Sequence, residues 1–210
     1  MIVVVFNKPD FEYDVHSLLK EFFLQEDVQM YYSCSPDEVE GKNLACTHHE
    51  MTDDGVKEFA DASQVFKIDY VGDEIAVEWT LNRAGVNNSM TDDIKISGES
   101  ICTKISVTGT DRKETKNRLK LALYSMIEKG TGKSLPWGTL SGIRPTKIAM
   151  KCIEDGMSDK ETYDYLKETY LASDEKIDLS IGIAKREKAL LDKVGSEEHT
   201  SELQSQFRIS

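Results

Sequence analysis

Long apolar segments are missing from this sequence of 210 residues. No apolar run approaches the ~18 residues that a membrane-spanning helix needs, so we expect no association with a membrane. Residues 1–6 are apolar, but they lack the basic segment and the small-residue cleavage site of a signal peptide. We therefore expect a cytoplasmic protein.

Cysteine and histidine are scarce, with four residues of each type. Cys34, Cys46, Cys102 and Cys152 are far apart, so no two have the CxxC or CxxxC spacing that closes a zinc or iron–sulfur chelate. We expect no metal site and no disulfide framework, and we interpret the cysteines as buried free thiols. The histidines are too scattered to complete a Ser-His-Asp set.

The sequence contains only the last part of a phosphate-binding loop motif. Gly132-Lys133-Ser134 matches the end of a P-loop, but the first glycine of that motif would fall at Ile127. A helix rather than a strand is expected before these residues, so no strand-to-helix turn would present amides to a phosphate. We exclude nucleotide hydrolysis and interpret the glycine as the end of a helix.

The formal net charge of the whole chain is −12, and positive charge is scarce in its first half. Residues 1–110 contain 8 basic and 21 acidic side chains, whereas residues 111–195 contain 17 basic and 14 acidic ones. An acidic surface repels phosphates, so binding of nucleic acid is not expected. The second part could face an anion, or its charges could be ordinary solvated helix faces.

The residues that are present predict an α+β fold, with a small mixed α/β N-terminal domain over residues 1–110. Two alternating apolar and polar runs flank Gly72, which is the pattern of a β-hairpin. We expect strands at 1–6, 28–32, 64–70, 74–81 and 101–107, and helices at 11–25 and 53–61.

Residues 111–195 predict an all-helical connector. Asp111 and Ser158 are each followed three residues later by a glutamate, which is typical of capping boxes. Helices are expected at 111–129, 145–155, 158–170 and from 173 to about 194. One face of the last helix would contain Ile177, Ile181, Ala184, Leu190 and Leu191.

The most distinctive stretch is LPWGTLSGIRPTKI, residues 135–148, with two glycines, two prolines and a tryptophan around one arginine and one lysine. In one interpretation it is a loop wedged between helices, with Trp137 buried and Arg144 paired with a carboxylate. In the other, Arg144 and Lys147 meet an anionic ligand or a partner domain at a helix N-terminus. The sequence leaves both open.

This stretch, with the residues that follow it to about 192, resembles the region that precedes the radical-SAM domain in HemZ-type oxygen-independent coproporphyrinogen III oxidases. The LPWGxLxGIRPTKI block carries the resemblance. It implies an enzyme of heme biosynthesis that binds a [4Fe-4S] cluster through a CxxxCxxC motif and cleaves S-adenosylmethionine to a radical. That radical would start the oxidative decarboxylation of propionates of a porphyrinogen substrate to vinyl groups.

The sequence departs from that family because no CxxxCxxC occurs in its 210 residues. The resemblance therefore implies an N-terminal fragment that binds neither cofactor, is inactive alone and lacks its C-terminal catalytic domain, a partner in cis. No catalytic or metal-binding residue is assigned. Arg144, Lys147 and Trp137 are candidates for contact with the substrate or with that domain. Residues 196–210 resemble a translated sequencing adapter, and we expect them to be an artefactual disordered tail.

Two other functions stay open, a non-enzymatic protein-interaction module and an RNA-binding accessory domain. RNA binding by the basic segment 112–151 requires its cations to cluster on one face. The position of an exposed apolar patch would distinguish the enzyme fragment from the protein-interaction module. A patch at 135–150 and 175–194 would indicate a missing domain, and one on the first half would indicate a partner module.

Overall fold

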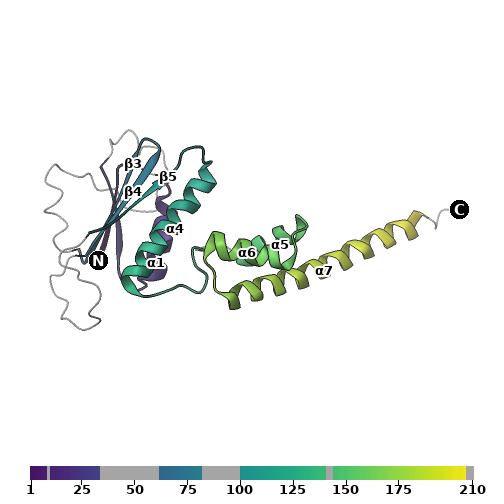
Figure 1. Cartoon of the computed structure of the whole chain (residues 1–210). Helices are drawn as coiled ribbons and strands as arrows, with labels where there is room; N and C mark the ends of the chain where they lie inside the picture. Colours follow the sequence, from purple (N-terminus) through teal and green to yellow (C-terminus); the bar gives the residue numbers. More distant parts are fainter. Residues whose placement is uncertain (9, 34–61, 82–99, 141–143, 207–210) are drawn as a thin grey trace. The chain divides into compact units, whose positions relative to one another are not determined.

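The computed structural model describes residues 1–8, 10–33, 62–81, 100–140 and 144–206, the side chains of 194–206 excepted. The chain forms two compact units, Met1–Ser134 and Leu135–Ser210 (Figure 1). The first combines a sheet with helices and the second is helical, so the expected α+β class is confirmed. The expected helix at 53–61 lies outside the described residues.

A mixed sheet forms the first unit. Its strands are β1 (Ile2–Phe6), β2 (Val28–Tyr32), β3 (Gln64–Val71), β4 (Glu74–Leu81) and β5 (Ser100–Ser106), in the order β2-β1-β3-β4-β5. β1 pairs in parallel with both β2 and β3, whereas β3, β4 and β5 pair antiparallel. Every residue of β1 is buried, as in central parallel strands that are covered on both faces.

The expected hairpin joins β3 to β4. Val71 pairs with Glu74, which leaves a two-residue turn at Gly72 and Asp73. Gly72 has a φ of 58°, in the left-handed region where glycine avoids the strain of a side chain. The sequence prediction of this hairpin is therefore confirmed.

The described helices of this unit are α1 (Glu12–Phe22) and α4 (Arg112–Thr131). The sequence analysis places the end of the first domain at residue 110, whereas the compact unit runs to Ser134 and includes α4. The reason is packing. The Tyr124 ring on α4 lies 5.2 Å from the Phe22 ring on α1, and α4 passes so close to β4 that a Cβ at Gly130 would lie 2.3 Å from the Trp79 ring.

The second unit contains α5 (Pro145–Glu154), α6 (Asp159–Tyr170) and α7 (Asp174–Gln206). The capping box that begins α6 at Ser158 is present in both directions, as expected. Residues 196–206 continue α7, in a part of the chain where the sequence analysis expects a disordered tail.

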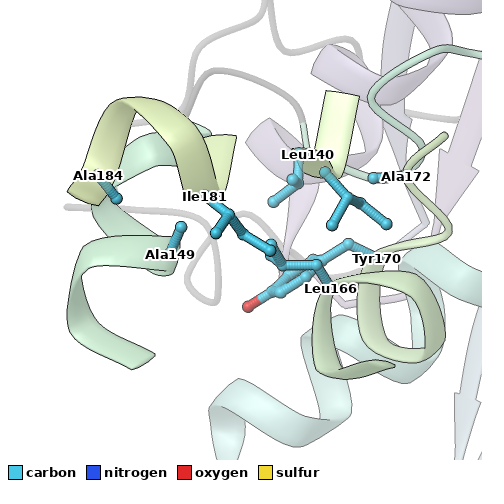
Figure 2. Close-up of a cluster of buried hydrophobic side chains, with 8 residues drawn as sticks. Leu140, Ala149, Leu166, Tyr170, Ala172, Ile181 and Ala184 are labelled. Atoms are coloured by element: carbon cyan, nitrogen blue, oxygen red, sulfur yellow. The ribbon is translucent and has the colours of Figure 1, made fainter. Parts of the chain in front are cut away.

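One hydrophobic core holds the second unit together (Figure 2). Leu140 and Ala172 approach it from the connecting segments, and the three helices supply the other side chains, which are Ala149, Leu166, Tyr170, Ile177, Ile181 and Ala184. Among the described residues, no helix has both the length and the apolar character that a bilayer requires.

Candidate functional site

The turn at Leu135–Leu140 connects to the far end of α6 through backbone hydrogen bonds. The Thr139 N–H donates to the Tyr170 carbonyl at 2.8 Å, and the Ser173 N–H donates to the Pro136 carbonyl at 2.9 Å. Gly138 is required between them, because a Cβ there would lie 1.9 Å from the Tyr170 carbonyl oxygen. The turn is therefore held by main-chain contacts, and the buried Thr139 hydroxyl also donates to the Tyr170 carbonyl at 3.4 Å.

Trp137 is half-buried against the core of the second unit. The Lys176 ammonium on α7 lies 5.6 Å from the centroid of its ring, in the range of a cation–π contact. The expectation of a fully buried tryptophan is therefore correct only in part. One side of Trp137 contacts the core, and a cation covers its ring.

Arg144 and Lys147 are both exposed at the N-terminus of α5. Arg144 is the N-cap, its side chain makes no capping hydrogen bond, and Pro145 occupies the first turn. Within the described part of the chain, neither cation has an ion pair or a side-chain hydrogen bond. The pairing of Arg144 with a carboxylate, expected if this stretch is only a wedged loop, does not occur among these residues.

A basic stripe extends these two residues along the outer face of α5. Lys151 follows Lys147 by one turn and is also exposed, so Arg144, Lys147 and Lys151 lie at helical positions i, i+3 and i+7. Ala149 and Cys152 face the core instead. Sequence reasoning missed Lys151, although its spacing from Lys147 was a usable signal. The positive charges of Arg144, Lys147 and Lys151 can attract carboxylates.

A groove of about 440 Å³ lies between α6 and α7. Tyr163, Ile181 and Gly182 contribute to its lining, and Lys185 pairs with Asp159 at its rim. The Tyr163 hydroxyl is hydrogen-bonded to Asp174, which raises the pKa of Tyr163 to about 12. No sequence pattern indicates this groove, because it depends on how two helices pack.

Part of the positive charge of the basic segment 112–151 is paired within the first unit. Arg112 pairs with Asp10 at 3.2 Å and Lys116 pairs with Asp14 at 3.7 Å. Burial alone would raise the pKa of Asp10, but its hydrogen bonds with Lys8 and Arg112 outweigh burial and lower that pKa. These contacts are internal to the first unit, and they remove positive charge that RNA binding would need.

The two cysteines that the structure describes lie in different units. Cys102 is exposed in the first unit and Cys152 is buried in the second, and Cys34 and Cys46 lie outside the described residues. Within the described ranges, no three His, Cys, Asp or Glu side chains are gathered in a metal-binding group. We therefore derive no reaction step through a cluster for this chain.

Comparison with known proteins gives one informative similarity. No family model and no solved structure matches the chain. Over 77 residues the chain is 39% identical to the oxygen-independent coproporphyrinogen-III oxidase-like protein HemZ of Bacillus subtilis (strain 168). The match covers 37% of this chain and only 15% of that relative. The resemblance of the sequence to HemZ-type oxidase-like proteins is thereby confirmed over about a third of the chain.

Proposed function

We propose that this chain is the N-terminal part of a cytoplasmic, oxygen-independent coproporphyrinogen III oxidase-like enzyme of heme biosynthesis. The similarity to HemZ over 77 residues carries the proposal. In the complete protein, a [4Fe-4S] cluster and S-adenosylmethionine would supply the radical that begins the oxidative decarboxylation of propionates. Both would be bound by a catalytic domain outside these 210 residues, which alone are inactive.

The test is to sequence the genomic DNA across the codon for Gly195 and to express the reading frame found there. We expect the frame to continue into a CxxxCxxC segment. The purified product should convert coproporphyrinogen III without oxygen when S-adenosylmethionine and a reductant are supplied, and the 210-residue chain should not. A genuine stop after Ser210, or a continuous product without this activity, would overturn the proposal.

Within this function, we assign carboxylate recognition to Arg144 and Lys147, with Trp137 supporting the segment that leads to α5. Both cations are exposed and have no acidic partner among the described residues. They also lie at the positive end of the α5 dipole. The carboxylates would belong either to the propionates of the substrate or to the catalytic domain.

Binding of coproporphyrin III, the stable fluorescent product of substrate oxidation, distinguishes the two sources. If the substrate is the source, the 210-residue chain quenches its fluorescence. Arg144→Ala/Lys147→Ala then weakens binding about a hundredfold or more, since each of the two charge-assisted contacts is worth about 1.5 kcal/mol or above. Lys167→Ala is the matched control, because Lys167 is exposed in the same unit but pairs with Asp174.

The second outcome places the carboxylates on the catalytic domain. The 210-residue chain then fails to bind coproporphyrin III, and the double variant lowers the thermal midpoint of the continuous product but not that of the chain. If the double variant changes neither binding nor stability, the assignment of Arg144 and Lys147 is wrong.

A further inference from the structure

The basic stripe of α5 places three cations in one line. Arg144, Lys147 and Lys151 are all exposed, and at 1.5 Å per residue the line is about 10 Å long. Glu154 and Asp155 are exposed one turn beyond Lys151, at the end of the helix, but neither forms an ion pair with a described residue. The described part of the chain therefore does not neutralise the stripe.

The position of these cations opposes the dipole of the helix. Backbone N–H groups make a helix N-terminus positive, so acidic side chains are favoured there and cations are not. The other described helices follow this rule, because α1, α4, α6 and α7 each have an acidic residue in the first turn. α5 has none, and Arg144 and Lys147 lie there instead. A local rule that is broken without a gain inside the fold is expected at a functional position.

Apolar side chains border the basic stripe on both sides. Ile148 and Met150 are half-buried, and each packs in part against the core of the second unit. At about 100° per residue, they lie about 80° to either side of the line from Lys147 to Lys151. The stripe is on the outer, convex side of a helix, whereas sites for small molecules are concave. None of its residues lines the groove between α6 and α7, so its shape fits the surface of a protein.

We propose that the basic stripe of α5 is a docking surface for an acidic surface of the catalytic domain that continues the same polypeptide. This inference rests on the proposed function, and it chooses between the two sources of carboxylates given there. Charge complementarity favours this partner, which would present carboxylates in a line of about 10 Å, as acidic residues at i, i+4 and i+7 of a helix do. Because 77 residues are 15% of the HemZ relative, that protein is more than twice as long as the 210 residues here.

The exposed leucines of α7 do not offer a comparable surface. Leu179, Leu190 and Leu191 are 47%, 63% and 64% exposed. Leu190 and Leu191 point about 100° apart around the helix, and Leu179 lies about 16 Å from Leu190 along its axis. These three residues therefore do not form the apolar patch that would indicate a missing domain. Charge, and not apolar area, marks the docking surface.

The experiment reverses the stripe with Arg144→Glu/Lys147→Glu/Lys151→Glu, in the 210-residue chain and in the continuous product of the genomic frame. In the short chain, we expect the thermal midpoint to stay within about 2 °C, because no described residue pairs with these cations. In the continuous product at low ionic strength, the midpoint should fall by roughly 5–10 °C, and added salt should reduce that difference. The neutral variant with glutamine at the three positions should give a smaller fall.

The control is Lys113→Glu/Lys129→Glu/Lys133→Glu, which changes the net charge by the same amount. These three lysines are exposed in the first unit and have no ion pair among the described residues. Lys113 and Lys129 lie near opposite ends of α4, so the effects of their reversal on the helix dipole offset each other. We expect this control to leave the midpoint of both proteins within about 2 °C.

Several results would overturn this inference. One is a continuous product whose midpoint is unchanged by reversal of the stripe, or falls equally in the control. Another is a 210-residue chain whose binding of coproporphyrin III is weakened by the reversal while the midpoint of the continuous product stays the same, because the substrate would then be the source of the carboxylates. A frame that stops at Ser210 removes the partner altogether. If the continuous product is active while the reversal is neutral, the docking inference fails and the proposed function stands. If the product is inactive but the reversal alone lowers its midpoint, docking stands and the proposed function fails.

Discussion

Replacing Gly138 by alanine tests how the second unit is held together. A Cβ at this position would lie 1.9 Å from the Tyr170 carbonyl oxygen and 2.5 Å from the Leu171 carbonyl carbon. Both are backbone atoms, so no side chain can move aside. The φ of 57° adds strain of about 1–2 kcal/mol for any residue with a Cβ.

The clash would separate the turn at residues 135–140 from the end of α6. The hydrogen bonds that Thr139 N–H donates to the Tyr170 carbonyl and that Ser173 N–H donates to the Pro136 carbonyl would then break. Each is worth about 0.5–1.5 kcal/mol net. Together with the strain, the loss of unfolding free energy is about 2–5 kcal/mol. That is a large part of the 5–15 kcal/mol that stabilises a typical domain.

Two other glycines of the same unit serve as controls. Gly156 has a φ of 82° with nothing within 4 Å of an added Cβ, so Gly156→Ala should cost only the strain, about 1–2 kcal/mol. Gly182 lies inside α7 with an ordinary φ and open space, so Gly182→Ala should stabilise the unit by up to about 1 kcal/mol.

The assay is urea denaturation followed by circular dichroism at 222 nm, with the fluorescence of Trp137 and Trp79 as a second signal. We expect the order of stability Gly182→Ala, unchanged chain, Gly156→Ala, Gly138→Ala. If Gly138→Ala were no more destabilising than Gly156→Ala, the close contact between the turn and α6 would not exist in solution, and the reasoning above would be refuted.

Three further predictions concern single side chains. Ser158→Ala removes the hydrogen bond that the Glu161 N–H donates to the Ser158 hydroxyl and should lower the unfolding free energy by about 1 kcal/mol, measured by urea titration, whereas Ser158→Asp should retain an acceptor there. The pKa of Asp10 is lowered in the folded chain, so its contribution to stability is present above about pH 4 and is lost as the pH falls through the folded pKa. Asp10→Asn should therefore make the melting temperature less dependent on pH in the acid range. If that dependence were unchanged, the pairing of Asp10 with Arg112 would be contradicted. The Tyr163 hydroxyl should ionise near pH 12 in a titration of absorbance at 295 nm. Asp174→Asn should move that ionisation toward pH 10. If it did not move, the hydrogen bond between Tyr163 and Asp174 would be absent.

The local elements were predictable without coordinates of the fold, because their signals lie within a few neighbouring residues. The β3–β4 hairpin follows from alternation around Gly72, whose φ of 58° a two-residue turn requires. The start of α6 follows from Ser158 and Glu161, which satisfy each other's backbone donors. At Asp111 only half of the expected box forms, since Glu114 pairs instead with Arg118.

The candidate site was predictable only in part. The block from Leu135 to Ile148 stands out by composition, and its resemblance to HemZ-type proteins needs no coordinates. Whether Arg144 has an acidic partner could not be read from the sequence, because the partner of a long charged side chain depends on which elements surround it. The exposure of Arg144 and Lys147 is a tertiary result.

Tertiary structure alone decided where the units divide and which apolar residues are covered. α4 joins the first unit because Tyr124 and Gly130 fit against Phe22 and Trp79, contacts between residues far apart in sequence. The sequence-based expectation that Leu190 and Leu191 share the apolar face of α7 is wrong for Leu190, because at about 100° per residue it lies about 120° away from Ala184. Both leucines are exposed in the structure.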